Sequence, residues 1–154
     1  MTQEEKEPID NILYVAACGI KNTKIMTQEE RDLLLKELCA RLPYGIFVNA
    51  KSIGLDGEIF DINVRYGMLK IAKDICTGES ELVPISDVKP YLRPMSSMTE
   101  EEHMKLKVAY DNGPNGLFDE YSHIDWLNAH HFDYRGLIPM GLALEAPEGM
   151  YKTE

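Results

Sequence analysis

Three of the four histidines fall close together near the C-terminal end of the chain, with carboxylates between them. Imidazole and carboxylate groups are common protein ligands of zinc and other transition metals, and they also carry out acid/base chemistry. This composition raises the hypothesis of a metal site in that segment. The candidate ligands are His123, Asp125, His130, His131 and Asp133.

The spacing of these residues favours a structural role instead. Ligands on one helix face should be three or four residues apart, whereas His130 and His131 are adjacent and diverge by about 100° on a helix. We therefore expect one of these two histidines to face the core and the other to face solvent, while Asp133 caps a following turn. A metal-dependent hydrolase is the alternative function, and no cofactor is expected.

The only tryptophan, Trp126, lies in the same segment, near His130, Tyr134 and Arg135. Aromatic and arginine side chains of this kind dominate the energy of many binding interfaces. These four residues are therefore the candidate binding residues. In the other interpretation, Trp126 is a core residue that joins the C-terminal helices to the rest of the fold.

Helices on both sides of a β-rich region must position these residues. Capping boxes, in which a threonine and a glutamate three residues later satisfy each other's backbone amides, are expected at Thr2, Thr27 and Thr99. The second box begins a predicted helix over residues 28–41, where leucines recur at near-helical spacing before Pro43 and Gly45.

Residues 44–93 alternate between apolar and polar side chains, which is typical of half-buried strands. Glycines separate these short runs, so we expect a small antiparallel SH3-like barrel or a bent sheet. Pro90 and Pro94 indicate a hinge. A helical cap is predicted over 99–143, with helices near 100–110 and 123–131, and the tail from Glu145 onward is expected to be extended or disordered.

The chain therefore reads as one α+β domain over residues 26–154, with an N-terminal helix, the barrel or bent sheet, and the C-terminal helical cap. Residues 1–25 form an N-terminal extension, in which residues 11–18 suit either a short helix or a strand. The length of 154 residues and the 44% of hydrophobic residues suffice for one packed core. Cys18, Cys39 and Cys76 lack the spacing of a disulfide framework or a metal knuckle.

Charge and hydropathy limit the partners. The net charge is −10, and residues 94–154 hold 4 basic and 11 acidic side chains, which is −7 of that total. Nucleic-acid binding needs clustered basic residues, so it is disfavoured, and the helix over 28–41 offers only a weak DNA-binding face. A basic protein is a more suitable partner.

The longest uncharged run, residues 11–20, is too short for a membrane helix. The acidic N-terminus is also unlike a signal peptide. Together these two features predict a cytoplasmic protein.

Two long segments, residues 87–102 and residues 124–138, carry a resemblance. They resemble a family of small proteins encoded by gut bacteria, often in prophage-like or other mobile regions of the genome. The resemblance covers residues 26–151 approximately. It implies no catalytic residue, because that family has no assigned activity. Together with the residues above, it predicts a non-enzymatic protein-interaction or regulatory module associated with a mobile element.

Overall fold

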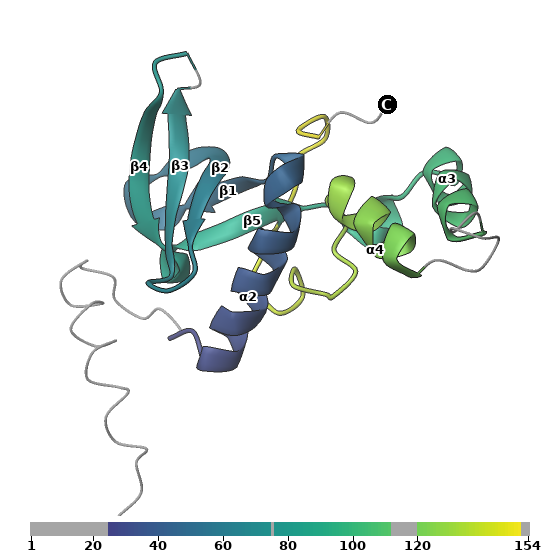
Figure 1. Ribbon diagram of the computed structural model, residues 1–154, viewed down its shortest axis with the longest axis horizontal. Coiled ribbons are helices and arrows are strands. Elements are labelled where there is room, and N and C mark those ends of the chain that lie inside the picture. The colour runs from purple at the N-terminus through teal and green to yellow at the C-terminus, as the bar shows by residue number, and fades with distance from the viewer. Residues whose placement is uncertain (1–24, 75, 112–119, 152–154) are drawn as a thin grey trace, which may run out of the picture.

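The computed structural model describes residues 25–74, 76–111 and 120–151, and these residues form an α+β fold. Helices and a six-stranded sheet make up the described part of the chain (Figure 1). The helices are α2 (Gln28–Arg41), α3 (Glu100–Asp111) and α4 (Glu120–Ala129). The strands are β1 (Phe47–Ala50), β2 (Leu55–Asn63), β3 (Met68–Asp74), β4 (Glu79–Pro84), β5 (Val88–Leu92) and β6 (Leu144–Glu145). Within these residues, no helix combines the length and the apolar character that crossing a membrane requires.

The sheet is open, so the SH3-like barrel, one of the two forms expected for residues 44–93, is wrong. The strand order is β4-β3-β2-β1-β5-β6, and β4 and β6 are its two edges. Closure would require the edge strands to pair with each other. Instead the C-terminal part of the chain adds β6 beside β5 in parallel orientation, whereas the other neighbouring strands are antiparallel.

Irregular pairing bends the strands at one side of the sheet. The register shifts between Ile59 and Asp61 in β2 and between Ala72 and Asp74 in β3. Bulges of this type increase the local twist. In β4, Glu81 lies directly opposite the buried Ile71, on the core-facing side, and forms an ion pair with Lys73.

Helix α2 begins where the sequence predicts. The Thr27 hydroxyl accepts from the Glu30 amide at 3.1 Å, and the Glu30 carboxylate accepts from the Thr27 amide at 3.0 Å. Both halves of the capping box are therefore present. The helix ends at Arg41, and Gly45 then turns the chain with a φ of 73°.

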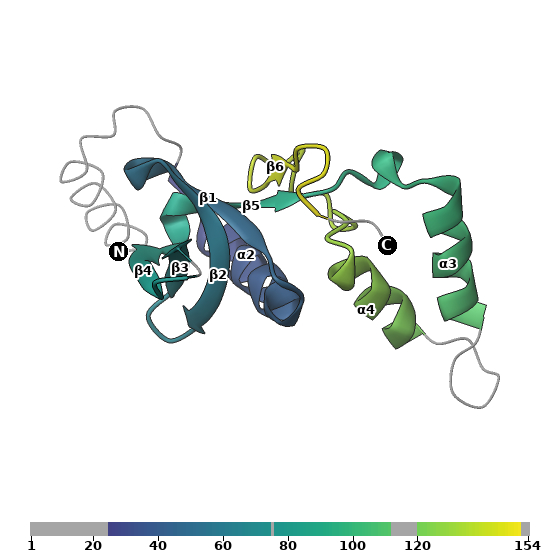
Figure 2. The same cartoon turned by 90° about the horizontal axis from the view of Figure 1, so that it is seen from above.

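Two apolar clusters hold the described residues together. The larger lies between α2 and the sheet, where Leu34 and Leu38 are fully buried, and burial of each leucine contributes about 1.5–3 kcal/mol. The smaller joins α3 and α4 through Leu106, Leu127 and Phe132. Figures 1 and 2 show this helical pair beyond the end of β5, to one side of the layer formed by α2 and the sheet.

Two expectations for the second half of the chain need correction. Pro90 lies inside β5, opposite Val48 of β1, and not in a hinge. Proline is tolerated there because β6 begins only opposite Tyr91, so the free side of β5 includes Pro90. Helix α4 ends at Ala129 and turns follow it, so the described residues of the predicted helical cap over 99–143 are helical only in α3 and α4. The capping box at Thr2 and Cys18 lie outside the described residues.

Candidate functional site

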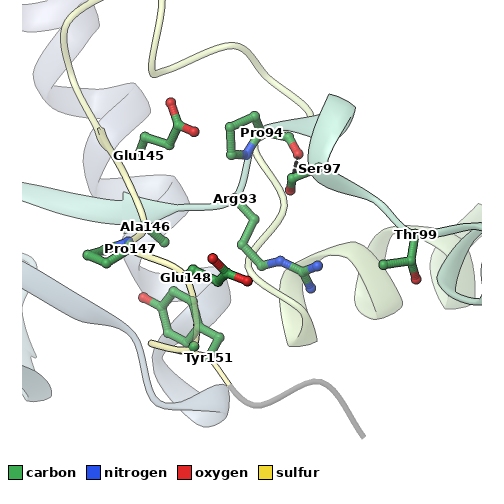
Figure 3. Close-up of a pocket in the computed structure, with 10 residues that line it drawn as sticks. Arg93, Pro94, Ser97, Thr99, Glu145, Ala146, Pro147, Glu148 and Tyr151 are labelled. Carbon is green, nitrogen blue, oxygen red and sulfur yellow. Dashed lines mark hydrogen bonds between the residues drawn. The ribbon is translucent and has the colours of Figure 1, made fainter.

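A pocket of about 840 Å³ opens where β5 leaves the sheet toward α3 (Figure 3). One wall is the segment after β5, including Arg93, Pro94, Ser97 and Thr99. The other wall is residues 144–151, which we call the strap. The strap residues that line the pocket are Glu145, Ala146, Pro147, Glu148, Gly149 and Tyr151. We call this the strap pocket.

Arg93 is held rigidly on the first wall. Its two terminal nitrogens donate to the two carboxylate oxygens of Glu102 at 2.8 and 2.9 Å, and its guanidinium lies 4.2 Å from the centre of the Phe132 ring. Burial tends to raise the pKa of Glu102, but hydrogen bonds from Arg93 and Thr99 outweigh it and hold the pKa below its usual value. The positive charge of Arg93 is therefore already matched.

The Thr99 capping box ties α3 to the same ion pair. The Glu102 amide donates to the Thr99 hydroxyl at 3.2 Å, and the Thr99 amide donates to the Glu102 carboxylate at 2.9 Å. The box that the sequence predicts at Thr99 is thus confirmed, and its glutamate also receives Arg93. The first turn of α3 and the end of β5 are joined through one carboxylate.

Tyr151 fixes the strap to the sheet. Its hydroxyl accepts from the Phe47 amide at 3.0 Å and donates to the Tyr91 carbonyl at 2.8 Å. Its ring stacks on the His131 imidazole, with ring centres 3.9 Å apart. Burial raises the pKa of the Tyr151 phenol, so this hydroxyl is neutral and structural at ordinary pH.

His131 and His130 face different surroundings, as the sequence suggests. His131 is buried, and its Nε2 donates to the Tyr44 carbonyl at 3.2 Å. Burial, followed by the nearby Arg41 charge, lowers the pKa of His131 to about 4. His130 is half-buried, and its Nδ1 donates to the carbonyl of Trp126 at 2.8 Å.

Asp133 caps the turn that follows it. Its two carboxylate oxygens accept from the amides of Leu137 and Ile138 at 2.7 and 2.9 Å. The expected capping role of Asp133 is therefore present. His123 meets Tyr110 edge-on, with ring centres 5.5 Å apart, and Asp125 is exposed.

The candidate metal ligands therefore point to separate partners. No three His, Cys, Asp or Glu side chains gather in a way that suits a metal ion within residues 25–74, 76–111 and 120–151. The hypothesis of a hydrolase built on His123, Asp125, His130, His131 and Asp133 required such a meeting, and the geometry gives it no support.

The candidate binding residues belong mainly to the smaller apolar cluster. Trp126 is half-buried, stacks on His130 with ring centres 3.9 Å apart, and lies parallel to Phe132. The Tyr134 hydroxyl donates to Asn128 Oδ1 at 2.9 Å. Trp126 is thus half-buried against the cluster of α3 and α4, which is separate from the larger cluster between α2 and the sheet.

Arg135 belongs to a buried charge network that sequence reasoning missed. Its Nε lies 2.6 Å from Glu37 Oε1, while Glu37 Oε2 receives Arg41 at 3.0 Å. Arg41 also donates to the carbonyl of Phe132 at 2.8 Å, and both Glu37 and Arg41 are fully buried. Buried charges require paired partners. Here the partners come from two segments, so the network connects α2 to the turn after α4.

The strap pocket itself was also missed. Arg93 and Thr99 lie in the first of the two segments that carry the resemblance, but the strap was expected to be extended or disordered. The signal in the sequence that could have indicated one wall of the pocket is the Thr99–Glu102 capping box. It fixes a carboxylate nine residues after Arg93 along the chain. Nothing local in the strap predicts its return to β5.

Comparison of the chain with models of protein families, with curated proteins and with solved structures finds no match. The geometry of the molecule is therefore the basis for a functional assignment.

Proposed function

We propose that this protein is a non-enzymatic protein-interaction module that binds a partner protein at the strap pocket. One observation carries this proposal: the pocket is a hollow of about 840 Å³ whose arginine, tyrosine and threonine side chains are already engaged within the protein. Binding sites typically measure about 300–1,000 Å³ and are largely formed before the ligand arrives.

The engaged groups argue for recognition over catalysis. A general acid or base works best with a pKa near the operating pH and with a proton free to move. The Tyr151 hydroxyl makes two hydrogen bonds to backbone groups and has a raised pKa. Arg93 and Glu102 neutralise each other, and the Thr99 hydroxyl caps α3.

The walls of the pocket also have the stiffness that specific recognition requires. A site held in its binding conformation loses less conformational entropy when it binds. The Arg93–Glu102 pair fixes one wall and Tyr151 fixes the other. A regulatory role in a mobile element agrees with the resemblance of residues 26–151 and is part of the same proposal.

A photoreactive amino acid placed in the pocket tests this function. Ser97 is exposed in the pocket wall, and Glu79 is exposed on β4, at the opposite edge of the sheet. After irradiation of native-host cells, we expect a discrete crosslinked protein from position 97 and none from position 79. Absence of a crosslink at position 97, or the same products at both positions, would contradict the proposal.

A further inference from the structure

The strap wall of the pocket carries negative charge that the described residues do not neutralise. Glu145 and Glu148 line this wall, and neither forms an ion pair with another described residue. Figure 3 shows Glu148 extending from the strap toward the middle of the pocket, with Glu145 further along the same wall. Because Glu102 already balances Arg93, the described residues that line the pocket have an excess of two negative charges.

The size and the remaining lining of the pocket indicate what kind of cation fits. A single metal ion would occupy a small fraction of about 840 Å³. Pro94, Ala146 and Pro147 offer apolar surface beside the carboxylates. Lysine and arginine bury their aliphatic stems against such surface while the charged end makes polar contacts.

We propose that the strap pocket receives an extended segment of the partner protein, with lysine or arginine side chains directed at Glu145 and Glu148. This inference rests on the proposed function and adds the chemistry of the partner. Hydrogen bonds between a cationic side chain and a carboxylate are roughly twice as strong as neutral ones. Arg93 does not oppose the incoming charge strongly, because its guanidinium is bound to Glu102 and lies over the Phe132 ring.

Peptide binding to the full chain tests the charge assignment. The probe is a fluorescent peptide of alternating lysine and proline, and the reference peptide has glutamine in place of every lysine. Anisotropy titrations at several salt concentrations compare the native chain with the double variant Glu145→Gln/Glu148→Gln. The double variant Glu79→Gln/Asp125→Asn changes the net charge equally and alters only exposed residues outside the pocket.

We expect the lysine peptide to bind the native chain at least about tenfold more tightly than the glutamine peptide, which corresponds to the loss of about one charge-assisted hydrogen bond. The pocket double variant should lose about tenfold in affinity. The control variant should lose less than about twofold, because both residues are exposed outside the pocket lining and salt screens exposed charges.

Other results would overturn the inference in distinguishable ways. Equal losses in the two double variants would show attraction to overall charge and not to the pocket. Equal binding of both peptides, or no binding of the lysine peptide, would refute the assignment of a cationic side chain to the pocket. A crosslink from position 97 would still support the proposed function in that case. Spermidine that displaces the lysine peptide at equal charge concentration would favour a free polyamine over a protein segment.

Discussion

The hydroxyl group of Tyr151 donates a hydrogen bond to the carbonyl oxygen of Tyr91 at 2.8 Å, just beyond the last residue pair of the ladder between β1 and β5. That last pair is Val48 with Pro90, and the next residue of β1 is Phe47, whose amide donates to the same hydroxyl at 3.0 Å. One side chain from the strap thus satisfies two backbone groups where the strands separate.

Removal of this hydroxyl should destabilise the fold. In Tyr151→Phe, the Phe47 amide and the Tyr91 carbonyl lose their shared partner, and unsatisfied buried groups cost about 1–3 kcal/mol. Urea denaturation should show that loss in the free energy of unfolding. Tyr66→Phe is the matched control, because Tyr66 is exposed, and its effect should stay within about 0.5 kcal/mol. Equal stability of the two variants would contradict the assigned role.

Because of His131, the free energy of unfolding should also decrease as the pH is lowered. Its pKa is lowered to about 4 in the folded state, against an ordinary value of 6.5, so the unfolded chain takes up a proton first as the pH falls. The contribution of neutral His131 is therefore complete above about pH 6.5 and is lost progressively down to about pH 4. The pKa difference corresponds to about 3 kcal/mol.

Urea titrations at several pH values can isolate this contribution. In His131→Asn, the component between pH 6.5 and 4 should disappear, and asparagine tolerates the φ of 59° at this position. The control is His103→Asn, because His103 is exposed on α3 and the variant should keep the native pH profile. A profile of His131→Asn that runs parallel to that of the native chain would refute this prediction.

The Arg93–Glu102 ion pair should show strong coupling in a double-mutant cycle. Its side chains are only 13% and 7% exposed, and loss of one partner leaves the other charge largely buried. We expect Arg93→Met or Glu102→Gln alone to cost about 3 kcal/mol and the double variant to cost less than the sum.

The exposed pair of Lys70 and Asp61 provides the reference cycle. Its side chains are 47% and 53% exposed and lie 3.5 Å apart, so a coupling below about 1 kcal/mol is expected. Thermal or urea unfolding of the native chain and the six variants gives both coupling energies. Equal coupling in the two pairs would mean that Arg93 does not fix the pocket wall.

Gly57 should tolerate no side chain. A Cβ atom there would lie 2.5 Å from the Ala72 carbonyl oxygen and 2.6 Å from Ile71 Cγ2, and the former is backbone of the neighbouring strand. Gly57→Ala should therefore cost about 1–3 kcal/mol through overpacking. In Gly78→Ala, an added Cβ meets open space, and only the cost of a φ of 70° remains, about 1 kcal/mol. Chemical denaturation that ranks Gly78→Ala as the more harmful change would disprove the close approach at Gly57.

Local chemistry made part of the fold predictable. The Thr27 and Thr99 boxes involve residues three apart, so their sequences alone determine the helix starts. The alternation in residues 44–93 likewise predicts strands, because strand side chains alternate between faces. The turn at Asp133 follows the same logic, since its carboxylate bonds amides four and five residues ahead.

Long-range contacts explain what was not predicted. Whether a sheet closes depends on its edges, and one edge here is made by Leu144 and Glu145 pairing with Tyr91 and Leu92. The strap pocket arises from the same return of the chain. The buried pair of Glu37 and Arg41 looks like an exposed helical ion pair in sequence, but Arg41 bonds the Phe132 carbonyl, which lies 91 residues away along the chain.

The position of Glu81 has a consequence for assembly between copies of the chain. Strand β4 is a free edge of the sheet, and Glu81 faces inward there, paired with Lys73. A strand from a second molecule that extended the sheet at β4 would have to enclose this charge in a newly formed interface. Inward-facing charges on edge strands discourage such fibre-like growth, so β4 is protected although nothing covers it in the described part of the chain.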